Sequence, residues 1–524
     1  MADQKKTSEK PIQVNRRSVL KGAVTLGAMA MGGGLALNMA APGSAEALVK
    51  KMPGKWDETW DVVVVGSGFA GLAAAAEAAG AGAKVVILEK MPTYGGNSII
   101  NGGVYAAWDS EFHYRQKLNL GEDSPQQHIN DTLKGGDYYN IPELVSVVAN
   151  GAPDALNWMI DEGGAKIRPT VTRAGGHTAY RTHAAVAGVG LEYTEALRKI
   201  AEKRGAKMVL NTEVTWIWRK DADPASPVLG VEVKRGRRTL NIKAKKAVVL
   251  ASGGFSRDIK MRMAHNPRLV PSFNCTNHPG ATGETIRFSQ AVGADTLQLN
   301  FIQLYPFAEP ETGILDTPAV YPFNGPGYGI VYVTKEGKRF VNELERRDVC
   351  AFAQINLGAK AKPTWSIFGE SMVLKMGGSM EEIAAGLSKG RFTKADTIAE
   401  LAGKINIPVD ALVETINKHN KYLADGKDPD FNKPITKVMI PMVQGPFYAV
   451  PQWPAVHHCM GGVRINPNAQ VIDVFGQVIP GFYCAGEATG GVHGSNRLGS
   501  NAIPDCVTFG RVAGKNAAKE KAKA

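Results

Sequence analysis

Residues 61–71 read DVVVVGSGFAG, and this stretch decides how the chain folds. Its continuous β-branched residues are typical of a strand buried in a parallel sheet. The alanine-rich segment that follows, to about Ala79, predicts a helix. Residues 84–89, KVVILE, predict a second strand that ends in an acid 23 positions after Gly66. Strand, glycine turn, helix and strand in this order predict a Rossmann-type βαβ unit.

Each part of this unit suits a dinucleotide. Gly66 permits a tight turn, Gly68 lets the backbone approach a pyrophosphate, and Gly71 allows close packing of helix on strand. The N–H groups at the helix start can hold phosphate oxygens, and the acid can hold ribose hydroxyls. The residues of this unit predicted to bind the cofactor are Gly66, Gly68, Phe69, Ala70, Gly71, Glu89 and Lys90.

Three later segments favour FAD over NAD. Residues 95–98 (GGNS) and the glycine pair at 102–103 follow soon after the ribose acid. Residues 247–255 (AVVLASGGF) and 479–491 (IPGFYCAGEATGG) each predict a buried strand that runs into glycines, the second followed by a helix start. Each pair alone is compatible with an ordinary turn, but their order predicts a flavin site. The further predicted FAD residues are Gly95, Gly96, Asn97, Ser98, Gly102, Gly103, Ala251, Ser252, Gly253, Glu487, Ser500, Asn501, Ala502 and Ile503.

Composition excludes several classes of protein. The chain has 524 residues, 44% of them hydrophobic, and a formal charge of +12, which are values of a folded protein of two or three domains. Its five cysteines show no C-x-x-C spacing, so we expect no covalent haem, zinc or iron–sulfur site. The charge is spread along the chain without a basic–aromatic motif, which favours anionic substrates or an acidic redox partner over nucleic acid.

Residues 1–47 have the layout of a twin-arginine export signal. A paired-arginine region at 15–21 (NRRSVLK) precedes a weakly apolar run to Ala41, and Ala45-Glu46-Ala47 offers a small-x-small cleavage site. We expect a cleaved signal rather than an uncleaved anchor, a periplasmic protein, and no membrane span in the mature chain.

Three segments combine histidines and arginines with small residues: 337–348 (GKRFVNELERRD), 456–463 (VHHCMGGV) and 493–502 (HGSNRLGSNA). Arg497 lies among Gly, Ser and Asn rather than on a charged helix face, which suits bidentate binding of a carboxylate. A lone histidine or arginine is usually structural, and a salt bridge of Arg347 to Asp348 or Glu343 is an open alternative.

With these motifs, residues 57–515 resemble the flavoprotein subunit of the fumarate reductase/succinate dehydrogenase family. The similarity is greatest to its soluble periplasmic branch of flavocytochrome c fumarate reductases and urocanate reductases. The resemblance implies an α/β fold in which a capping α+β domain is inserted into a Rossmann-type FAD domain. We place the FAD domain at 52–299 and 457–515 and the cap at 300–456. The first histidine after the ribose acid is His113, beyond both glycine pairs, so we expect FAD to be non-covalent.

The resemblance also implies roles for site residues. Arg497 and His457 match the pair that clamps a substrate carboxylate, and Arg347 matches the cap arginine that donates a proton after hydride transfer from flavin N5. Backbone carbonyls match positions that hold a structural sodium in some relatives, namely those of Cys459, Met460, Gly461, Glu487 and Thr489.

The chain departs from the fumarate reductase pattern at two places. Residues 303–306 read QLYP where those enzymes carry Q-x-H-P, and the positions of their Glu and Arg proton relay fall on Phe323 and Pro326. A second carboxylate would be poorly paired beside Tyr305 and Phe323, because an unpaired buried charge costs several kcal/mol. We therefore expect an unsaturated monocarboxylate, (meth)acrylate or an arylacrylate, bound by Tyr305, Phe323, His457, Arg497 and Gly499. Glu343, Glu345 or Tyr305 remain open as the proton route.

The predicted function is thus FAD-dependent reduction of the C=C bond of an unsaturated carboxylate. Electrons would come from a separate donor, a periplasmic c-type cytochrome. A fumarate reductase with an altered relay, a 3-ketosteroid-dehydrogenase-like enzyme and a non-enzymatic flavin protein are the alternatives.

Overall fold

Strand β1 (Glu58–Val65) lies at the centre of the largest sheet in the computed structural model, which describes residues 50–221, 223, 225–316 and 320–523. It pairs in parallel with β2 (Val85–Leu88) on one side and with β9 (Arg238–Leu250) on the other. The β-branched run from Val62 to Val65 is at most 5% exposed, as a central parallel strand requires.

The strand order of this sheet is β17–β18–β9–β1–β2–β6, and β7 and β8 extend it from β9. β18 is parallel to β9 and β6 is parallel to β2, whereas β17 is antiparallel to β18, β8 to β9 and β7 to β8. The bounds of these strands are β6 (Lys207–Val209), β7 (Thr212–Arg219), β8 (Val228–Arg235), β17 (Gln470–Ile472) and β18 (Val478–Cys484). The carboxyl ends of the parallel strands therefore meet at one edge, where ligands bind in doubly wound folds.

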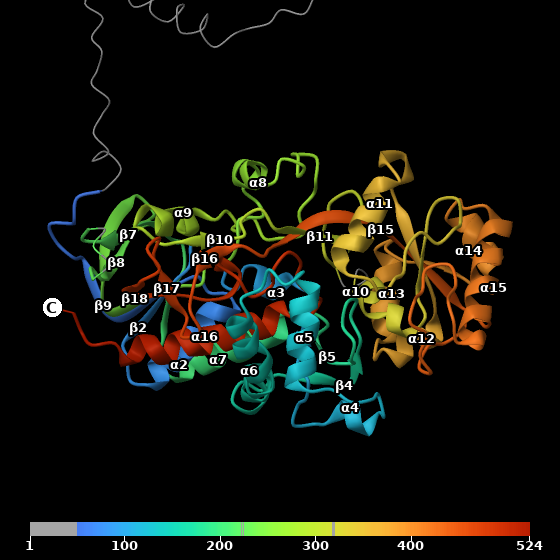
Figure 1. Ribbon diagram of the computed structural model, residues 1–524, viewed down its shortest axis with the longest axis horizontal. Helices are drawn as coiled ribbons and strands as arrows, with labels where there is room; N and C mark the ends of the chain where they lie inside the picture. The colour runs from blue at the N-terminus through green and yellow to red at the C-terminus, as the bar shows by residue number, and fades with distance from the viewer. Residues whose placement is uncertain (1–49, 222, 224, 317–319, 524) are drawn as a thin grey trace, which may run out of the picture. The chain divides into compact units, whose positions relative to one another are not determined.

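Two helices pack closely against each other beside this sheet, α2 (Phe69–Gly80) and α16 (Ala502–Lys519) (Figure 1). A Cβ atom at Gly510 would lie 2.5 Å from the carbonyl oxygen of Ala70, and one at Gly514 would lie 2.2 Å from that of Ala74. Only glycine allows this approach, which brings two segments far apart in sequence side by side. Helices α6 (Pro142–Asp161) and α7 (Leu191–Lys203) pack against the same pair.

A second sheet has the order β11–β15–β13–β12, with β14 paired to β15. The long strand β15 (Phe447–Cys459) pairs antiparallel with β11 (Ile302–Ala308) at one edge and with β13 (Thr364–Gly369) at the other. Aromatic and aliphatic side chains of both faces form a core separate from that of the first sheet. Helices α14 (Ile398–Lys404) and α15 (Val409–Asp425) lie at the end of this region farthest from β9 and β2 (Figure 1).

The remaining helices and strands complete the fold. They are α3 (Asn97–Ile100), β3 (Val104–Ala106), α4 (Tyr114–Lys117), α5 (Pro125–Gly135), β4 (Ile167–Thr172), β5 (Thr182–Ala185), α8 (Ile259–His265), α9 (Glu284–Ala291), β10 (Thr296–Leu297), α10 (Val320–Asn324), η4 (Pro326–Tyr328), β12 (Val331–Val333), α11 (Arg347–Asn356), η5 (Ala359–Ala361), α12 (Glu370–Lys375), α13 (Met380–Ser388), β14 (Thr393–Ala395), α14 (Ile398–Lys404), α15 (Val409–Asp425), β16 (Gly462–Arg464), η6 (Gly486–Ala488) and β19 (Thr489–Gly490).

The fold class predicted from the sequence is confirmed: a Rossmann-like parallel sheet is accompanied by a second α+β region inserted between β9 and β18. The helix expected directly after Glu487 is wrong. That residue lies in the short turn η6, and the chain then pairs with β16 as β19, so the regular helix begins only at Ala502.

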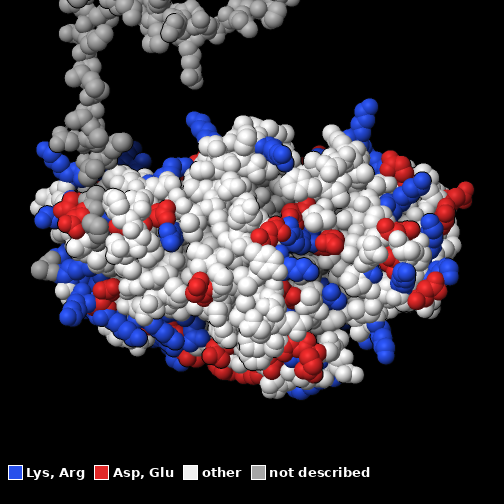
Figure 2. All heavy atoms as spheres, in the orientation of Figure 1, with Lys and Arg blue, Asp and Glu red and all other residues white. Residues whose placement is uncertain are grey.

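Residues 52–524 form one compact unit. The division into a FAD domain and a cap stays a prediction, and strand β15 runs through its boundary at 456/457. The predicted export signal at 1–47 lies outside the described residues. In the part of the chain that the structure describes, every helix is too short or too polar to cross a bilayer. Basic and acidic side chains are interspersed over the face shown in Figure 2, as the spread of charge along the sequence predicts.

Candidate active site

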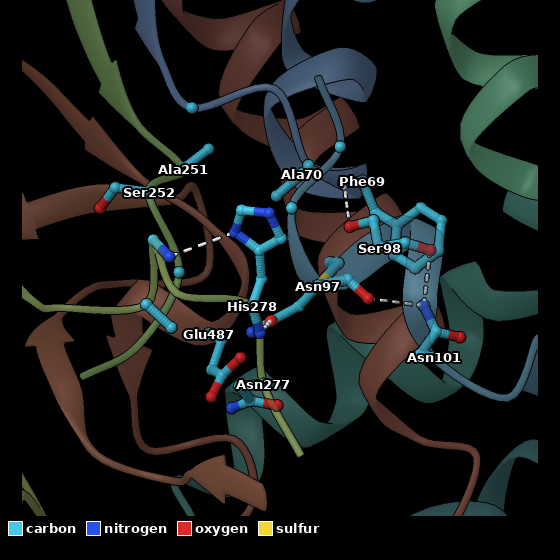
Figure 3. A pocket seen from close by; sticks show the side chains of 18 of the residues that line it. Phe69, Ala70, Asn97, Ser98, Asn101, Ala251, Ser252, Asn277, His278 and Glu487 are labelled. Carbon is cyan, nitrogen blue, oxygen red and sulfur yellow. Dashed lines mark hydrogen bonds between the residues drawn. The ribbon is translucent and has the colours of Figure 1, made fainter. Parts of the chain in front are cut away.

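An elongated cavity begins where β1, β2 and β9 end and runs to the second sheet. Figure 3 shows segments that are distant in sequence around one space: Phe69 and Ala70, Asn97 and Ser98, Ala251 and Ser252, Asn277 and His278, and Glu487. Most residues predicted to bind the cofactor line this cavity: Gly66, Gly68, Phe69, Ala70, Glu89, Lys90, Gly95, Gly96, Asn97, Ser98, Gly102, Ala251, Ser252, Gly253, Glu487, Ser500, Ala502 and Ile503. The predicted reaction residues Tyr305, Phe323, Arg347, His457 and Arg497 line it too.

The turn at Gly66 is accessible only to glycine. Its φ is +102°, and an added Cβ atom would lie 2.3 Å from the carbonyl oxygen of Ala251. At Gly71, a Cβ atom would lie 2.0 Å from the carbonyl oxygen of Gly66, so this residue packs helix on strand rather than lining the cavity. The N-terminus of α2 is thereby held at the cavity wall, where its positive end favours phosphate.

Glu89 is held in place by its neighbours. Its Oε2 accepts hydrogen bonds from the Ser67 hydroxyl at 2.6 Å and the Ser67 amide at 3.1 Å, and its Oε1 accepts one from the Met91 amide at 2.9 Å. The Ser67 hydroxyl also accepts a hydrogen bond from the Gly95 amide at 2.9 Å. This small network fixes the carboxylate at the end of β2, as a ribose-binding acid requires.

The cavity fits a flavin dinucleotide. At Gly96 and Gly253, φ is +48° and +78°, and added Cβ atoms would meet nothing within 4 Å, so both face open space. Glu487, 12% exposed, accepts a hydrogen bond from the Cys459 amide at 3.0 Å, and burial raises its pKa to about 7. One continuous space thus joins the end predicted to bind phosphate and ribose to a second end beside Arg347 and Arg497.

Both arginines at this second end are almost fully buried, Arg347 at 7% exposed and Arg497 at 3%. The amide oxygen of Gln303 accepts from Arg497 Nη2 at 3.1 Å and from Arg347 Nη1 at 3.3 Å. The buried Nε atoms of both arginines have no hydrogen-bond partner among the described residues. Because buried donors are normally paired, two converging guanidiniums with unused donors indicate the binding of an anion.

Two aromatic rings flank the guanidinium of Arg347. Its central carbon lies 4.8 Å from the ring centroid of Tyr305 and 4.7 Å from that of Phe323. Burial lowers the pKa of Arg347 to about 10, and that of Arg497 falls well below its usual range through burial and the charge of Arg347. A lowered pKa makes Arg347 a stronger proton donor than an exposed arginine.

His457 lies beside the same group. Its Nδ1 is 2.6 Å from the Thr276 hydroxyl, and its ring centroid is 4.9 Å from that of Tyr305. Burial, followed by the charges of Arg347 and Arg497, lowers its pKa well below the usual value. His457 is therefore neutral at physiological pH and offers a hydrogen bond rather than a charge.

Some predicted site residues lie behind the cavity wall. The side chain of Asn501 binds His128 and Thr132, with its Oδ1 3.0 Å from His128 Nε2. Gly103 packs against the Val189 backbone, and Gly499 packs against the Phe323 ring, which a Cβ atom at Gly499 would approach to 2.2 Å. Of the predicted sodium ligands, Glu487 lines the cavity, whereas Cys459, Met460, Gly461 and Thr489 lie in the adjoining strand ends and turns.

Two of the residues considered for proton delivery are placed elsewhere. The Glu343 carboxylate pairs with Arg339 at 2.7 Å and Lys433 at 3.1 Å, and the attraction of these two cations outweighs burial and lowers its pKa to about 2. Glu345 is exposed. Of the three candidates, only Tyr305 lines the cavity with Arg347. The alternative of a salt bridge from Arg347 to Asp348 or Glu343 is wrong, because Asp348 pairs with Arg346 instead.

Several residues at the site are not among those predicted from the sequence. One is Gln303, for which a polar residue flanked by apolar ones in a strand is a usable signal. The segment from Thr276 to Thr285 also lines the cavity through Asn277 and His278, and it carries no recognisable motif. Its place at the site comes from pairing of Thr276 and Asn277 with the backbone of β15.

Several known proteins are similar to this chain in sequence or in fold. The sequence pattern of the family described as FAD binding domain matches residues 61–503. A fumarate reductase (cytochrome) of Shewanella frigidimarina is 38% identical over 469 residues, covering 89% of this chain and 78% of that protein. The acrylate reductase flavoprotein subunit of Shewanella woodyi is 36% identical over 515 residues, covering 96% of this chain and 98% of that protein.

A solved structure, the open conformation of a flavocytochrome c3 fumarate reductase, superposes with a TM-score of 0.68 at 32% identity. The superposition covers 99% of this chain and 83% of the chain in that structure. The chain therefore belongs to the FAD-binding family that includes fumarate and acrylate reductase flavoproteins, and it is an FAD-dependent oxidoreductase.

Proposed function

We propose that this protein reduces the C=C bond of an α,β-unsaturated monocarboxylate, such as (meth)acrylate or an arylacrylate. The observation that carries the proposal is the pair of buried arginines whose Nε donors are unused, at the end of the cavity opposite the dinucleotide turn. Bound non-covalently along that cavity, FAD would supply a hydride to one alkene carbon.

The chain's own residues would do the rest. Arg497 and His457 bind the substrate carboxylate and withdraw electron density from the alkene, so that carbanion character is tolerated in the transition state. Arg347, with its lowered pKa, donates a proton to the neighbouring carbon. Its flanking rings and its burial keep water from that proton.

The monocarboxylate preference is supported by the wall opposite the clamp. Tyr305 and Phe323 are 2% and 4% exposed, and Leu315 lines the cavity beside them. A second carboxylate there would lose its hydration without gaining a cation of its own, since Arg347 already interacts with both rings.

Three further features complete the proposal. The electron donor is a separate protein, a periplasmic c-type cytochrome. Export through the twin-arginine signal would place the enzyme in the periplasm. A structural sodium ion held by the carbonyls of Cys459, Met460, Gly461, Glu487 and Thr489 stays a prediction from the family resemblance.

Anaerobic turnover with reduced methyl viologen tests the substrate class. Acrylate, methacrylate, cinnamate, urocanate and fumarate are offered in turn, and we expect the highest kcat/KM with one of the uncharged-tail monocarboxylates. Arg347→Gln should lower kcat by about a thousandfold or more with little change in KM, because it removes proton donation. Arg497→Gln should raise KM by about a hundredfold. Fumarate turnover above all other substrates would overturn the substrate proposal, and full activity of either variant would overturn its role.

Fumarate reduction with an altered relay is the second candidate. It is favoured by the relatives named fumarate reductase, and it predicts that fumarate exceeds acrylate in the same assay. Ketosteroid dehydrogenation is disfavoured by Arg497, because a ketone has no charge to pair with a buried guanidinium.

A further inference from the structure

The segments that carry Arg347 and Arg497 meet a second time near the protein surface, at Asp137. Both terminal nitrogens of Arg346 donate to the Asp137 carboxylate, with Nη2 at 3.1 Å from Oδ2. The hydroxyl of Ser495 donates to the same oxygen at 2.5 Å. One carboxylate therefore joins the residue immediately before Arg347 to the residue two positions before Arg497.

The Asp137 turn is attached firmly to the segment that carries Arg497. The carbonyl of Gly136 accepts from the Ser495 amide at 3.0 Å, and that of Gly135 accepts from the Asn496 side chain at 3.3 Å. Farther along, the Ile141 amide donates to the Gly491 carbonyl at 2.7 Å. Asp137 is thus a fixed part of this side of the site.

The backbone of the turn is strained in order to place the carboxylate. Asp137 and Tyr138 both have left-handed conformations, with φ of +52° and +59°. Aspartate tolerates this region, but a bulky residue such as tyrosine rarely adopts it. Hydrogen bonds from the Asp137 and Tyr138 amides to the end of α5 hold the turn in this shape.

On the opposite side, Arg346 is oriented before it meets Asp137. Asp348 accepts from its Nε at 3.0 Å and from its Nη2 at 2.6 Å. Arg346 immediately precedes α11, so its position sets where the first residue of that helix, Arg347, points. Because the Arg346 guanidinium is hydrogen-bonded to the carboxylates of both Asp137 and Asp348, its orientation is restricted.

We propose that Asp137 is a positioning residue for the reaction: through Arg346 and Ser495 it fixes the proton donor Arg347 relative to the carboxylate clamp at Arg497. This inference rests on the proposed function of those two arginines. It predicts that the two segments are coupled at the surface by Asp137 as well as inside by Gln303.

The test uses the full-length flavoprotein with Asp137→Asn, Arg346→Gln and the double variant. We expect each single variant to lower kcat about tenfold with KM within about twofold, because proton donation needs the geometry more than binding does. The double variant should be no slower than the slower single variant, as expected for partners in one interaction. Glu162→Gln is the matched control, because the Arg204–Glu162 pair is exposed to nearly the same degree, 23% and 45% against 21% and 47%.

A second readout does not depend on turnover. Hydrogen–deuterium exchange of peptides covering 342–350 should quicken about fivefold or more in Asp137→Asn and stay unchanged in Glu162→Gln. If the wild type reduces no enoate, the proposed function fails, and this exchange still decides the coupling. Unchanged exchange in Asp137→Asn, a kcat within twofold of wild type, or multiplicative losses in the double variant would each overturn the inference.

Discussion

Gln303 and Arg497 share a buried hydrogen bond of 3.1 Å, and the same amide oxygen also accepts from Arg347. The amide nitrogen of Gln303 is fixed in turn by Asn496 Oδ1 and the Arg497 carbonyl, each at 2.7 Å. A neutral acceptor thereby holds two like charges close together without neutralising either. Under the proposed function, Arg497 is thereby left for the substrate carboxylate and Arg347 for proton donation.

Replacing Gln303 should separate positioning from charge. Gln303→Leu removes the common acceptor, and we expect kcat/KM to fall about thirtyfold, since two buried donors lose their partner. Gln303→Glu should instead raise KM more than Gln303→Leu does, because an internal carboxylate competes with the substrate for the arginines. Steady-state kinetics with the preferred enoate measure both effects. Gln452→Leu, another buried amide in the second sheet, is the control and should leave KM unchanged.

Tyr305 should determine whether the enzyme prefers substrates with one carboxylate or with two. In Tyr305→His an imidazole, which can carry a positive charge, replaces the neutral phenol of the far wall and can pair with a second carboxylate, so the ratio of kcat/KM for fumarate to that for acrylate should rise at least about tenfold. Tyr305→Phe keeps the ring and should leave the ratio within about threefold of wild type. A fumarate preference that is the same in all three proteins would contradict the specificity argument.

The turn at Gly66 should be essential for flavin loading. In Gly66→Ala the new methyl group meets the Ala251 carbonyl at 2.3 Å, so the phosphate-binding turn must shift. We expect purified protein without flavin absorbance, because this turn is predicted to hold the pyrophosphate of FAD. Gly82→Ala is the matched control: its φ is also positive, at +84°, but nothing lies within 4 Å of the added atom. Flavin bound to both variants alike would count against the assignment of this turn to FAD.

Because of Glu487, the flavin-free protein should be less stable at neutral and alkaline pH than at acidic pH. Its folded pKa of about 7 lies above the usual 4.5, so the folded state binds the proton more tightly than the unfolded state does. The stabilisation present below pH 4.5 is therefore lost as pH rises to 7. Urea unfolding should show that, between pH 5 and pH 8, the free energy of unfolding falls by about 2–3 kcal/mol less in Glu487→Gln than in the wild type. Parallel curves for the two proteins would show that Glu487 is ionised throughout.

The end of the site predicted to bind the dinucleotide could be predicted from local sequence. The run from Val62 to Val65, the glycines at 66, 68 and 71 and the acid at 89 lie within thirty residues, and their spacing alone predicts strand, turn, helix and strand. This prediction succeeded because backbone conformation and hydrophobic burial at these positions depend on near neighbours. The helix expected after Glu487 failed, because pairing of β19 with the distant strand β16 overrode the local pattern.

The residues at the end of the cavity beside Arg347 and Arg497 could be predicted from the family resemblance, but their geometry could not be predicted from the order of residues in the sequence. Gln303, Arg347, His457 and Arg497 come from four separate parts of the chain, and the pairing of β11 with β15 and the turn at 493–501 bring them together. The same holds for Asp137, whose partners are more than two hundred residues away. Residue types along the chain therefore specified a flavin-binding fold and the groups available for catalysis. Long-range packing decided which of those groups meet, because the burial and mutual charge that set their pKa values exist only once distant segments exclude water from the same space.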